Sequence, residues 1–192
     1  MKTPAVFFDR DGTINIDPGY LGDPELVKLF PNVPQSISKL RNIFGFKIVV
    51  VSNQSGVSRG LISADDVEKV NLKINELLKP EDALIDAFYF CPYHPQFSPI
   101  EKCSCRKPSP EMILTAADDL NIDLSKSYMV GDKASDIISG FNAGVKTVLI
   151  STSKNDEQII ILQKEDKRPN FVAENFSSAC NFICNDFSGG KT

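Results

Sequence analysis

The stretch AVFFDRDGTI at residues 5–14 decides the fold, because a short apolar run leads straight into a polar turn. Residues 5–8 predict a buried strand, since consecutive apolar side chains leave neither face of the strand polar. Two carboxylates, Asp9 and Asp11, follow at once, and Gly12 allows the backbone to turn tightly after them. We therefore expect both acids to lie together at the carboxyl end of a buried strand.

Apolar runs and amphipathic segments alternate along the rest of the chain. Strand-like runs lie at 46–51, 87–90, 127–130 and 145–150, with a short one near 171–172. Helical patterns lie at 34–44, between Ser63 and Pro80, after Ser109-Pro110, at 135–142 and around 177–183, with one more in the tail. This alternation predicts an α/β fold, a three-layer α/β/α Rossmann-like parallel sheet. We expect a single domain over residues 1–192, with a cysteine-containing loop at 91–105 and no large cap domain.

The composition is typical of a globular protein and disfavours two classes of partner. The 192 residues carry a net charge of -4, with 42% hydrophobic and 24% charged residues. An acidic balance disfavours binding to a nucleic-acid backbone, and no apolar run approaches the roughly 20 residues that span a bilayer. The N-terminus lacks the apolar region of a secretory signal. We expect a cytoplasmic monomer that acts on a small molecule, with no nucleic acid or membrane as partner.

Four polar clusters follow the ends of predicted strands. After the box at 9–14 come the turn at 52–56, the basic pair Arg106-Lys107 and the segment 131–136. Ligands of open parallel sheets bind at the carboxyl ends of the strands, so the clusters are expected to share one site. Carboxylates suit Mg²⁺, a carboxylate can attack phosphorus, and fixed cations offset the charge of a phosphoryl group. Each cluster alone could be an ordinary turn or a solvated basic pair, but together they predict phosphoryl chemistry.

An Asp-x-Asp-x-Thr box, a Ser, a Lys and a final acidic pair in this order resemble the signature of haloacid dehalogenase superfamily phosphatases. Segments 9–14, 17–20, 52–56, 91–92, 103–108 and 131–132 resemble one branch of it, and the likeness runs from about residue 5 to residue 172. That branch holds the D-glycero-D-manno-heptose 1,7-bisphosphate phosphatases and the related histidinol-phosphate phosphatases. The resemblance implies hydrolysis of a small sugar phosphate, with the heptose bisphosphate favoured over histidinol phosphate. A nucleic-acid end phosphatase and a non-catalytic phosphate-binding module are the alternatives.

The resemblance also implies a role for each matching residue. Asp9 would be the nucleophile and a magnesium ligand, and Asp11 would be the general acid and base, giving the metal its backbone carbonyl. Asp132 would complete the protein ligands of Mg²⁺. Ser52 would hold the phosphoryl group and Lys107 would neutralise it. The residues implied to contact or wall the substrate are Asp17, Pro18, Gly19, Tyr20, Asn53, Gln54, Ser55, Arg106 and Lys133, with Asp136 supporting its neighbours from behind.

The loop at 91–105 raises the question of a second metal. Cys91, His94, Cys103 and Cys105 are four donors of the kind that tetrahedral Zn²⁺ prefers. The resemblance implies structural zinc here, held by Cys-x-His followed by Cys-x-Cys, but Tyr93 occupies the position where the histidine is expected. Two interpretations stay open. Either His94 replaces the missing imidazole and the loop binds zinc, or the site is degenerate and the cysteines are free thiols.

Overall fold

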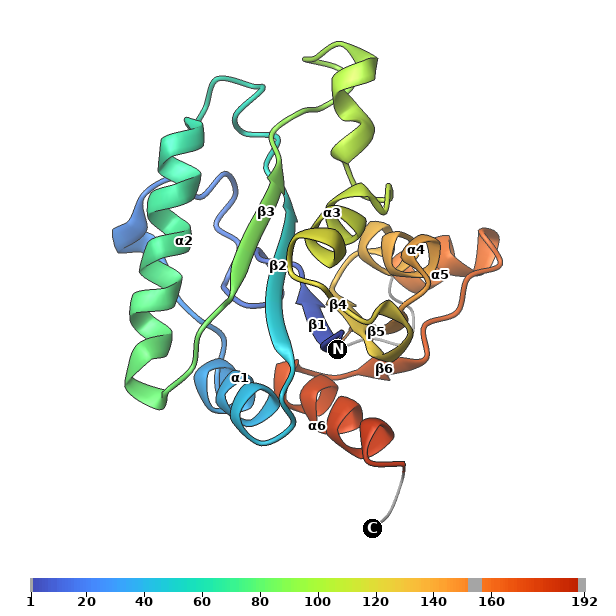
Figure 1. Ribbon diagram of the computed structural model, residues 1–192. Helices are drawn as coiled ribbons and strands as arrows, with labels where there is room; N and C mark the ends of the chain where they lie inside the picture. The colour runs from blue at the N-terminus through green and yellow to red at the C-terminus, as the bar shows by residue number, and fades with distance from the viewer. Residues whose placement is uncertain (1, 152–156, 190–192) are drawn as a thin grey trace.

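The computed structural model describes residues 2–151 and 157–189, and its centre is a six-stranded sheet in which every pair of neighbouring strands is parallel (Figure 1). The order of the strands is β3-β2-β1-β4-β5-β6. The strands are β1 (Ala5–Phe8), β2 (Lys47–Asn53), β3 (Ala87–Cys91), β4 (Tyr128–Gly131), β5 (Lys146–Ile150) and β6 (Phe171–Ala173). The strand order confirms the predicted three-layer Rossmann-like fold.

Helices cover both faces of the sheet, as connections between parallel strands require. They are α1 (Val33–Asn42), α2 (Ala64–Leu78), α3 (Glu111–Asp119), α4 (Ala134–Ala143), α5 (Glu157–Lys164) and α6 (Phe176–Phe187). One core cluster joins the sheet to α1, α2 and α6, and a second joins it to α3 and α4. Figure 1 shows these two groups of helices on opposite sides of the strands.

Strand β1 shows why the opening apolar run needs both layers. Val6 and Phe8 belong to the core under α1, α2 and α6, whereas Ala5 and Phe7 belong to the core under α3 and α4. All four side chains are fully buried, because successive residues of a strand point to opposite faces. A central strand between two helical layers therefore holds the following residue, Asp9, in a fixed position.

The observed elements differ from the predicted ones mainly at their ends. Strand β2 continues to Asn53, so Ser52 belongs to the strand itself rather than to the turn. Ser63 caps α2 through a reciprocal bond with Asp66, as its position before the helix indicated. The cysteine loop contains a short 3-10 helix, Ile100–Cys105, which its Pro- and Ser-rich sequence did not predict.

The sheet changes direction beside β1, and this places the site. The chain moves outward from β1 through β2 to β3, then crosses back to β4 on the other side of β1. At such a switch point the connections diverge and leave a crevice at the carboxyl ends of the strands. Asp9 follows β1 and Asp132 follows β4, so both acids flank this crevice.

Within the described ranges, none of the helices is long and apolar enough to cross a membrane.

Candidate active site

The buried amine of Lys107 brings three of the four polar clusters together. The Lys107 amine lies 2.7 Å from a carboxylate oxygen of Asp9 and 2.7 Å from one of Asp136, and it also donates to the Val51 carbonyl at 2.7 Å. Lys107 and Asp9 are 4% and 5% exposed, so water screens this ion pair very little. The predicted meeting of residues far apart in the sequence is therefore present in the structure.

A group of three carboxylates at the strand ends offers oxygen ligands for a metal. Asp9, Asp132 and Asp136 each present one carboxylate oxygen, and these oxygens lie within 4.8 Å of one another. In the part of the chain that the structure describes, this is the one group of three or more such ligands. An all-oxygen set fits Mg²⁺ rather than zinc. The Asp136 side chain was expected to act from behind, whereas the structure places it inside the group.

The electrostatics of these carboxylates also fit a cation. Burial raises the pKa of Asp9 to about 7, against the opposing charge of Lys107. Burial, together with the charge of Asp136, raises the pKa of Asp132 to about 6. Two amines, Lys107 and Lys133, act on these three carboxylates and leave one negative charge in partly buried surroundings. A divalent cation would supply the missing positive charge.

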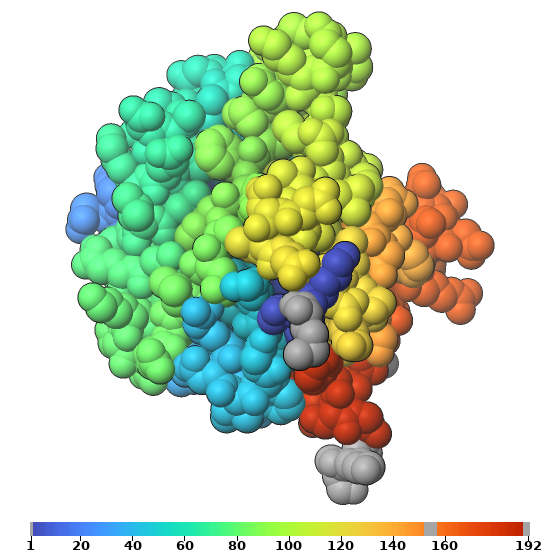
Figure 2. All heavy atoms as spheres, viewed as in Figure 1, coloured from blue at the N-terminus to red at the C-terminus, as the bar shows by residue number. Residues whose placement is uncertain are grey.

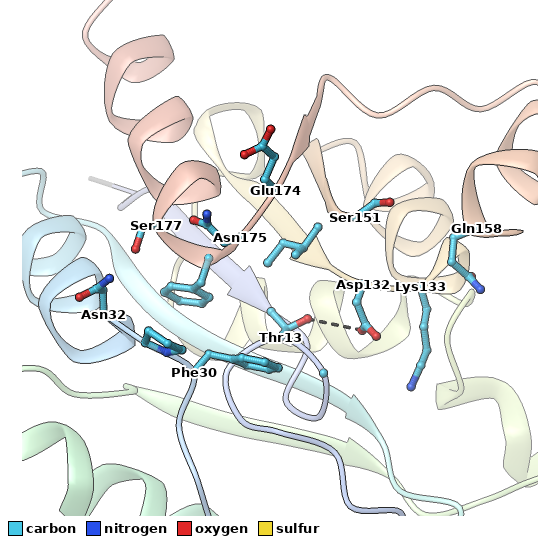
Figure 3. Close-up of a pocket in the computed structure, with 14 residues that line it drawn as sticks. Thr13, Phe30, Asn32, Asp132, Lys133, Ser151, Gln158, Glu174, Asn175 and Ser177 are labelled. Carbon is cyan, nitrogen blue, oxygen red and sulfur yellow. Dashed lines mark hydrogen bonds between the residues drawn. The ribbon is translucent and has the colours of Figure 1, made fainter. Parts of the chain in front are cut away.

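Gly12 brings the first acid box against Asp132. Its backbone adopts a φ of +90°, and a Cβ placed there would lie 2.5 Å from an Asp132 carboxylate oxygen. Only glycine satisfies both the left-handed conformation and this close approach. The Thr13 hydroxyl faces the same carboxylate at 3.5 Å, as Figure 3 shows.

Asp11 occupies a very different environment from Asp9, although only one residue separates them. Its carboxylate accepts bonds from the guanidinium of Arg10 at 2.9 Å, from Asn15 at 2.9 Å and from Gln54 at 2.8 Å. Burial acts to raise its pKa, but the charge of Arg10 and these three donors outweigh burial and lower the pKa. The Arg10 side chain is completely buried and also donates to Asn71 of α2 at 3.0 Å. A hydrogen-bonded scaffold therefore fixes Asp11 beside the nucleophile.

The end of β2 and the turn after it form hydrogen bonds within the site and also line the cavity. Ser52 is buried at 3% exposure, and Gln54 donates to its hydroxyl at 3.3 Å. The Asn53 amide donates to the Lys107 carbonyl at 3.2 Å and accepts from the Lys107 backbone N–H at 3.0 Å. Asn53 and Gln54 thus hold Lys107 and Asp11 in place, a positioning role that the sequence did not reveal.

A cavity of about 400 Å³ opens above these groups. It contains most of the predicted substrate residues, and Pro18 lies outside it in a neighbouring depression. Its lining includes Asp9, Asp11, Asp17, Gly19, Tyr20, Asn53, Gln54, Ser55, Arg106, Lys107 and Lys133. A second cavity of about 780 Å³ is lined by Asp132, Lys133, Phe30 and Phe176, among others (Figure 3), and Lys133 lines both cavities. The nucleophile candidate opens into the smaller cavity, which is therefore the candidate substrate site.

The four candidate zinc donors do not gather into one site. Cys91 and Cys105 form a disulfide, and the buried Cys103 thiol contacts the Pro99 carbonyl at 3.6 Å. The His94 ring nitrogen Nδ1 accepts a bond from the backbone of Gln96. In this arrangement the donors do not fit a zinc ion, because a disulfide removes two thiolates. The loop projects at the top of the molecule, coloured yellow-green in Figures 1 and 2.

Several residues of the site were not predicted from the sequence. Arg10 lies inside the acid box and Asn15 follows that box directly, but nothing in the spacing of either residue indicated a contact with Asp11. Asn71 had a visible signal, since it lies between Val70 and Ile74 on the apolar stripe of α2. A polar residue on a buried helix face needs a partner, and here that partner is Arg10.

Comparisons with known proteins agree with this geometry. The HAD-hydrolase-like family profile matches residues 104–179. The D-glycero-beta-D-manno-heptose-1,7-bisphosphate 7-phosphatase of Escherichia coli is 43% identical over 157 residues, which cover 80% of this chain and 82% of that protein. The D-glycero-D-manno-heptose-1,7-bisphosphate 7-phosphatase of Thermosynechococcus vestitus is 37% identical, over 96% of this chain and 97% of that one. The chain belongs to this phosphatase family of the haloacid dehalogenase superfamily.

A solved structure supports the same membership. The D,D-heptose 1,7-bisphosphate phosphatase from B. bronchiseptica, complexed with magnesium and phosphate, superposes with a TM-score of 0.81 at 25% identity. The match covers 96% of this chain and 99% of that chain. The predicted superfamily, branch and class of enzyme, a magnesium-dependent phosphatase, are thereby confirmed. The roles of individual residues stay predictions.

Proposed function

We propose that this single-domain phosphatase removes the 7-phosphate of D-glycero-D-manno-heptose 1,7-bisphosphate through an aspartyl-phosphate on Asp9. The observation that carries the proposal is the convergence of Asp9, Asp132 and Asp136 on the Lys107 amine at the carboxyl ends of β1 and β4. The names of relatives at 43% and 37% identity support the choice of substrate. The cavity of about 400 Å³ is large enough for a small phosphorylated sugar.

Each side chain of the site would have its own role in the reaction. Asp9 and Asp132, with support from Asp136, would hold Mg²⁺, which would offset the charge of the phosphoryl oxygens. The Asp9 oxygen attacks phosphorus in line with the leaving sugar oxygen, and Lys107 neutralises the transferring group. Asp11 protonates the leaving oxygen, and the same carboxylate then takes a proton from the water that cleaves the aspartyl-phosphate.

The resting hydrogen bonds suggest how Asp11 changes its protonation state. Its low pKa in the free enzyme keeps it ionised, while Arg10, Asn15 and Gln54 all donate to it. An incoming phosphate places further negative charge beside this carboxylate and so favours its protonated form. Substrate binding would thereby prepare the acid that the first step needs.

A phosphate-release screen with Mg²⁺ tests the proposal. The panel contains both anomers of the heptose bisphosphate, histidinol phosphate, other sugar phosphates and a phosphorylated oligonucleotide. We expect the highest kcat/KM for one heptose bisphosphate anomer, with release of one phosphate per molecule. A higher kcat/KM for histidinol phosphate or for the oligonucleotide would overturn the substrate assignment while leaving the phosphatase reaction intact.

We further propose that the chain is a cytoplasmic monomer and that its reduced cysteine loop can bind zinc. The support for zinc is the presence of Cys91, His94, Cys103 and Cys105 within one short segment. The disulfide argues for the oxidised alternative, which a reducing cytoplasm would disfavour. Metal analysis of protein purified with reductant and without chelator tests the zinc site. Less than about 0.2 zinc per chain would exclude it, since a structural site binds stoichiometrically.

A further inference from the structure

Arg59 joins the three loops that wall the candidate substrate cavity. It lies between β2 and α2, and its guanidinium carbon is 4.4 Å from the ring centre of Phe97 and 5.7 Å from that of Tyr20. Phe97 belongs to the cysteine loop and Tyr20 to the loop after β1. A planar guanidinium packs well against aromatic faces, so the two rings hold Arg59 in a defined position.

Within the described residues, 2–151 and 157–189, no acidic side chain forms an ion pair with Arg59 or with its neighbour Arg106. The Nε atom of Arg59 is buried and has no hydrogen-bond partner within the described chain. Arg106 donates to the Tyr93 carbonyl at 3.3 Å.

The two guanidinium groups lie close enough to repel each other. Burial lowers the pKa of Arg106, and the positive charge of Arg59 lowers it further. Burial also lowers the pKa of His94, and both arginines add to that effect. Like charges in partly dry surroundings destabilise each other unless an anion lies between them. The arrangement therefore favours binding of an anion beside the two guanidinium groups.

The position of this cationic pair relates it to the reaction. Arg106 and Tyr20 line the same cavity of about 400 Å³ as Asp9 and Lys107. The reacting phosphoryl group belongs beside Asp9, where the metal ligands and Lys107 converge. A second anionic group of the same molecule would then extend along the cavity toward Arg106 and Tyr20, where Arg59 packs against the Tyr20 ring.

We propose that Arg59, together with Arg106, binds the second, non-reacting phosphate of a bisphosphate substrate and so selects bisphosphates over monophosphates. The inference rests on the proposed function and assigns a residue to its specificity. Two guanidinium groups can direct several N–H donors at the oxygens of one phosphate, which a single lysine cannot. Tyr20 and Phe97 would act through Arg59, by fixing its plane.

The test compares the Arg59→Met variant with the unaltered enzyme on matched substrates. Methionine keeps an apolar side chain between the two rings but removes the charge. We expect KM for the sugar bisphosphate to rise about 10- to 100-fold, the loss typical of a charge-assisted contact, with kcat changed less than about threefold. For the monophosphate that keeps only the reacting phosphate, kcat/KM should stay within about threefold.

Two further variants separate binding from folding. Arg59→Lys keeps the charge but not the plane, so it should recover part of the loss in KM. Arg41→Met is the matched control, because Arg41 is a half-buried arginine that pairs with Asp86 at 2.6 Å, away from the cavity. It should leave KM unchanged for both substrates. An equal loss on both substrates in Arg59→Met, or no loss on either, would overturn the proposal.

A binding measurement distinguishes this proposal from the substrate assignment. Hydrolysis of p-nitrophenyl phosphate is inhibited in turn by fructose 1,6-bisphosphate and by fructose 6-phosphate, and the two Ki values are compared. We expect the bisphosphate to inhibit more strongly, and Arg59→Met to abolish the difference. If that difference appears without turnover of the heptose bisphosphate, the substrate assignment fails and the anion site stands. If the heptose bisphosphate is turned over with a KM that does not depend on Arg59, the anion site fails instead.

Discussion

The floor and the wall of the cavity are built by different means. The floor consists of Asp9, Asp132, Asp136 and Lys107. Asp9 and Asp132 directly follow β1 and β4, and buried ion pairs join Lys107 to Asp9 and Asp136. The wall consists of loop residues. Tyr20 lines the cavity, and Arg59 packs against the rings of Tyr20 and Phe97, which are each 49% exposed. The floor is fixed by the fold and can serve any phosphate ester, whereas the wall depends on contacts between loops and can choose among esters. Substitutions in the floor should therefore abolish the reaction, and substitutions in the wall should change its selectivity.

The largest effect is expected at the nucleophile. Asp9→Asn replaces the attacking carboxylate by a neutral amide, which is a poor nucleophile and a weaker metal ligand, so kcat should fall at least about 1000-fold on every phosphate ester. The fold should survive, because Lys107 keeps its ion pair with Asp136 at 2.7 Å. Phosphate release and circular dichroism on the same preparation measure both outcomes. Asp65→Asn, in the first turn of α2, is the control, and substantial turnover by Asp9→Asn would rule out the covalent mechanism.

A second test of the floor concerns stability. Lys107→Met leaves Asp9 and Asp136 buried without their cation, which should lower the free energy of unfolding by about 3–5 kcal/mol in metal-free protein. Lys146→Met is the matched control, since the side chains of its ion pair with Asp186 are 45% and 28% exposed and such a pair is worth at most about 1 kcal/mol. Urea unfolding of the three proteins at neutral pH gives the comparison. Equal losses in both variants would mean that the buried ion pairs of Lys107 stabilise the fold no more than the partly exposed pair of Lys146 does.

These two tests concern residues that sequence patterns placed correctly, and the reason is physical. An apolar run followed by Asp9 fixes a strand and its carboxyl end, and parallel strands must bring such ends to one edge. The same logic located Asp132, which directly follows β4. Lys107 does not follow a strand end as predicted, because the 3-10 helix Ile100–Cys105 precedes it and a loop brings it to the site. Loops have no such period, so the contacts of Arg59 with Tyr20 and Phe97 could not be derived from spacing.

The cysteine loop shows the same limit on what the sequence can predict. Four donors in one short segment allow a zinc site, free thiols or a disulfide, and their spacing does not distinguish these states. The structure pairs Cys91 with Cys105, and this pairing was not among the alternatives considered. Asn71 is a different case, because a single polar residue on the apolar stripe of α2 signalled a buried partner that spacing alone could not name.

Two glycine-to-alanine substitutions, at Gly12 and at Gly45, test whether the acid box must lie so close to Asp132. Gly12→Ala places a methyl group 2.5 Å from the Asp132 carboxylate and should weaken Mg²⁺ binding about 10- to 100-fold, as disturbed ligand positions do elsewhere. Gly45→Ala has a similar φ of +71° with nothing within 4 Å of the new Cβ. Both variants bear a left-handed backbone strain of about 1–2 kcal/mol, and only Gly12→Ala adds the contact with Asp132. Titration with Mg²⁺ measures the effect of that contact, and equal affinities would show that the approach is not needed.

The pH dependence of metal binding gives an effect of about tenfold. The pKa values of Asp9 and Asp132 are raised to about 7 and about 6, so both carboxylates hold protons that a cation must displace at pH 5–6. Mg²⁺ affinity should therefore rise with pH and level off above about pH 8. Calorimetry at pH 6 in two buffers of different ionisation enthalpy should detect proton release on binding. An affinity that stays constant between pH 5.5 and 8 would contradict the raised pKa values of Asp9 and Asp132.

The smallest effect is expected in the wall, and it sharpens the comparison most directly. Phe97→Leu removes one of the two aromatic faces that hold Arg59, a contact of about 0.5–1 kcal/mol at a half-exposed site. KM for the sugar bisphosphate should rise about two- to fivefold, while kcat and the monophosphate reaction stay unchanged. Phe141→Leu is the control, because Phe141 also packs against a cation, Lys167 at 5.1 Å, but belongs to α4 rather than to the loops around Arg59. A fall in kcat for Phe97→Leu would mean that the wall supports the chemistry as well as the choice of substrate, and the division between floor and wall would fail.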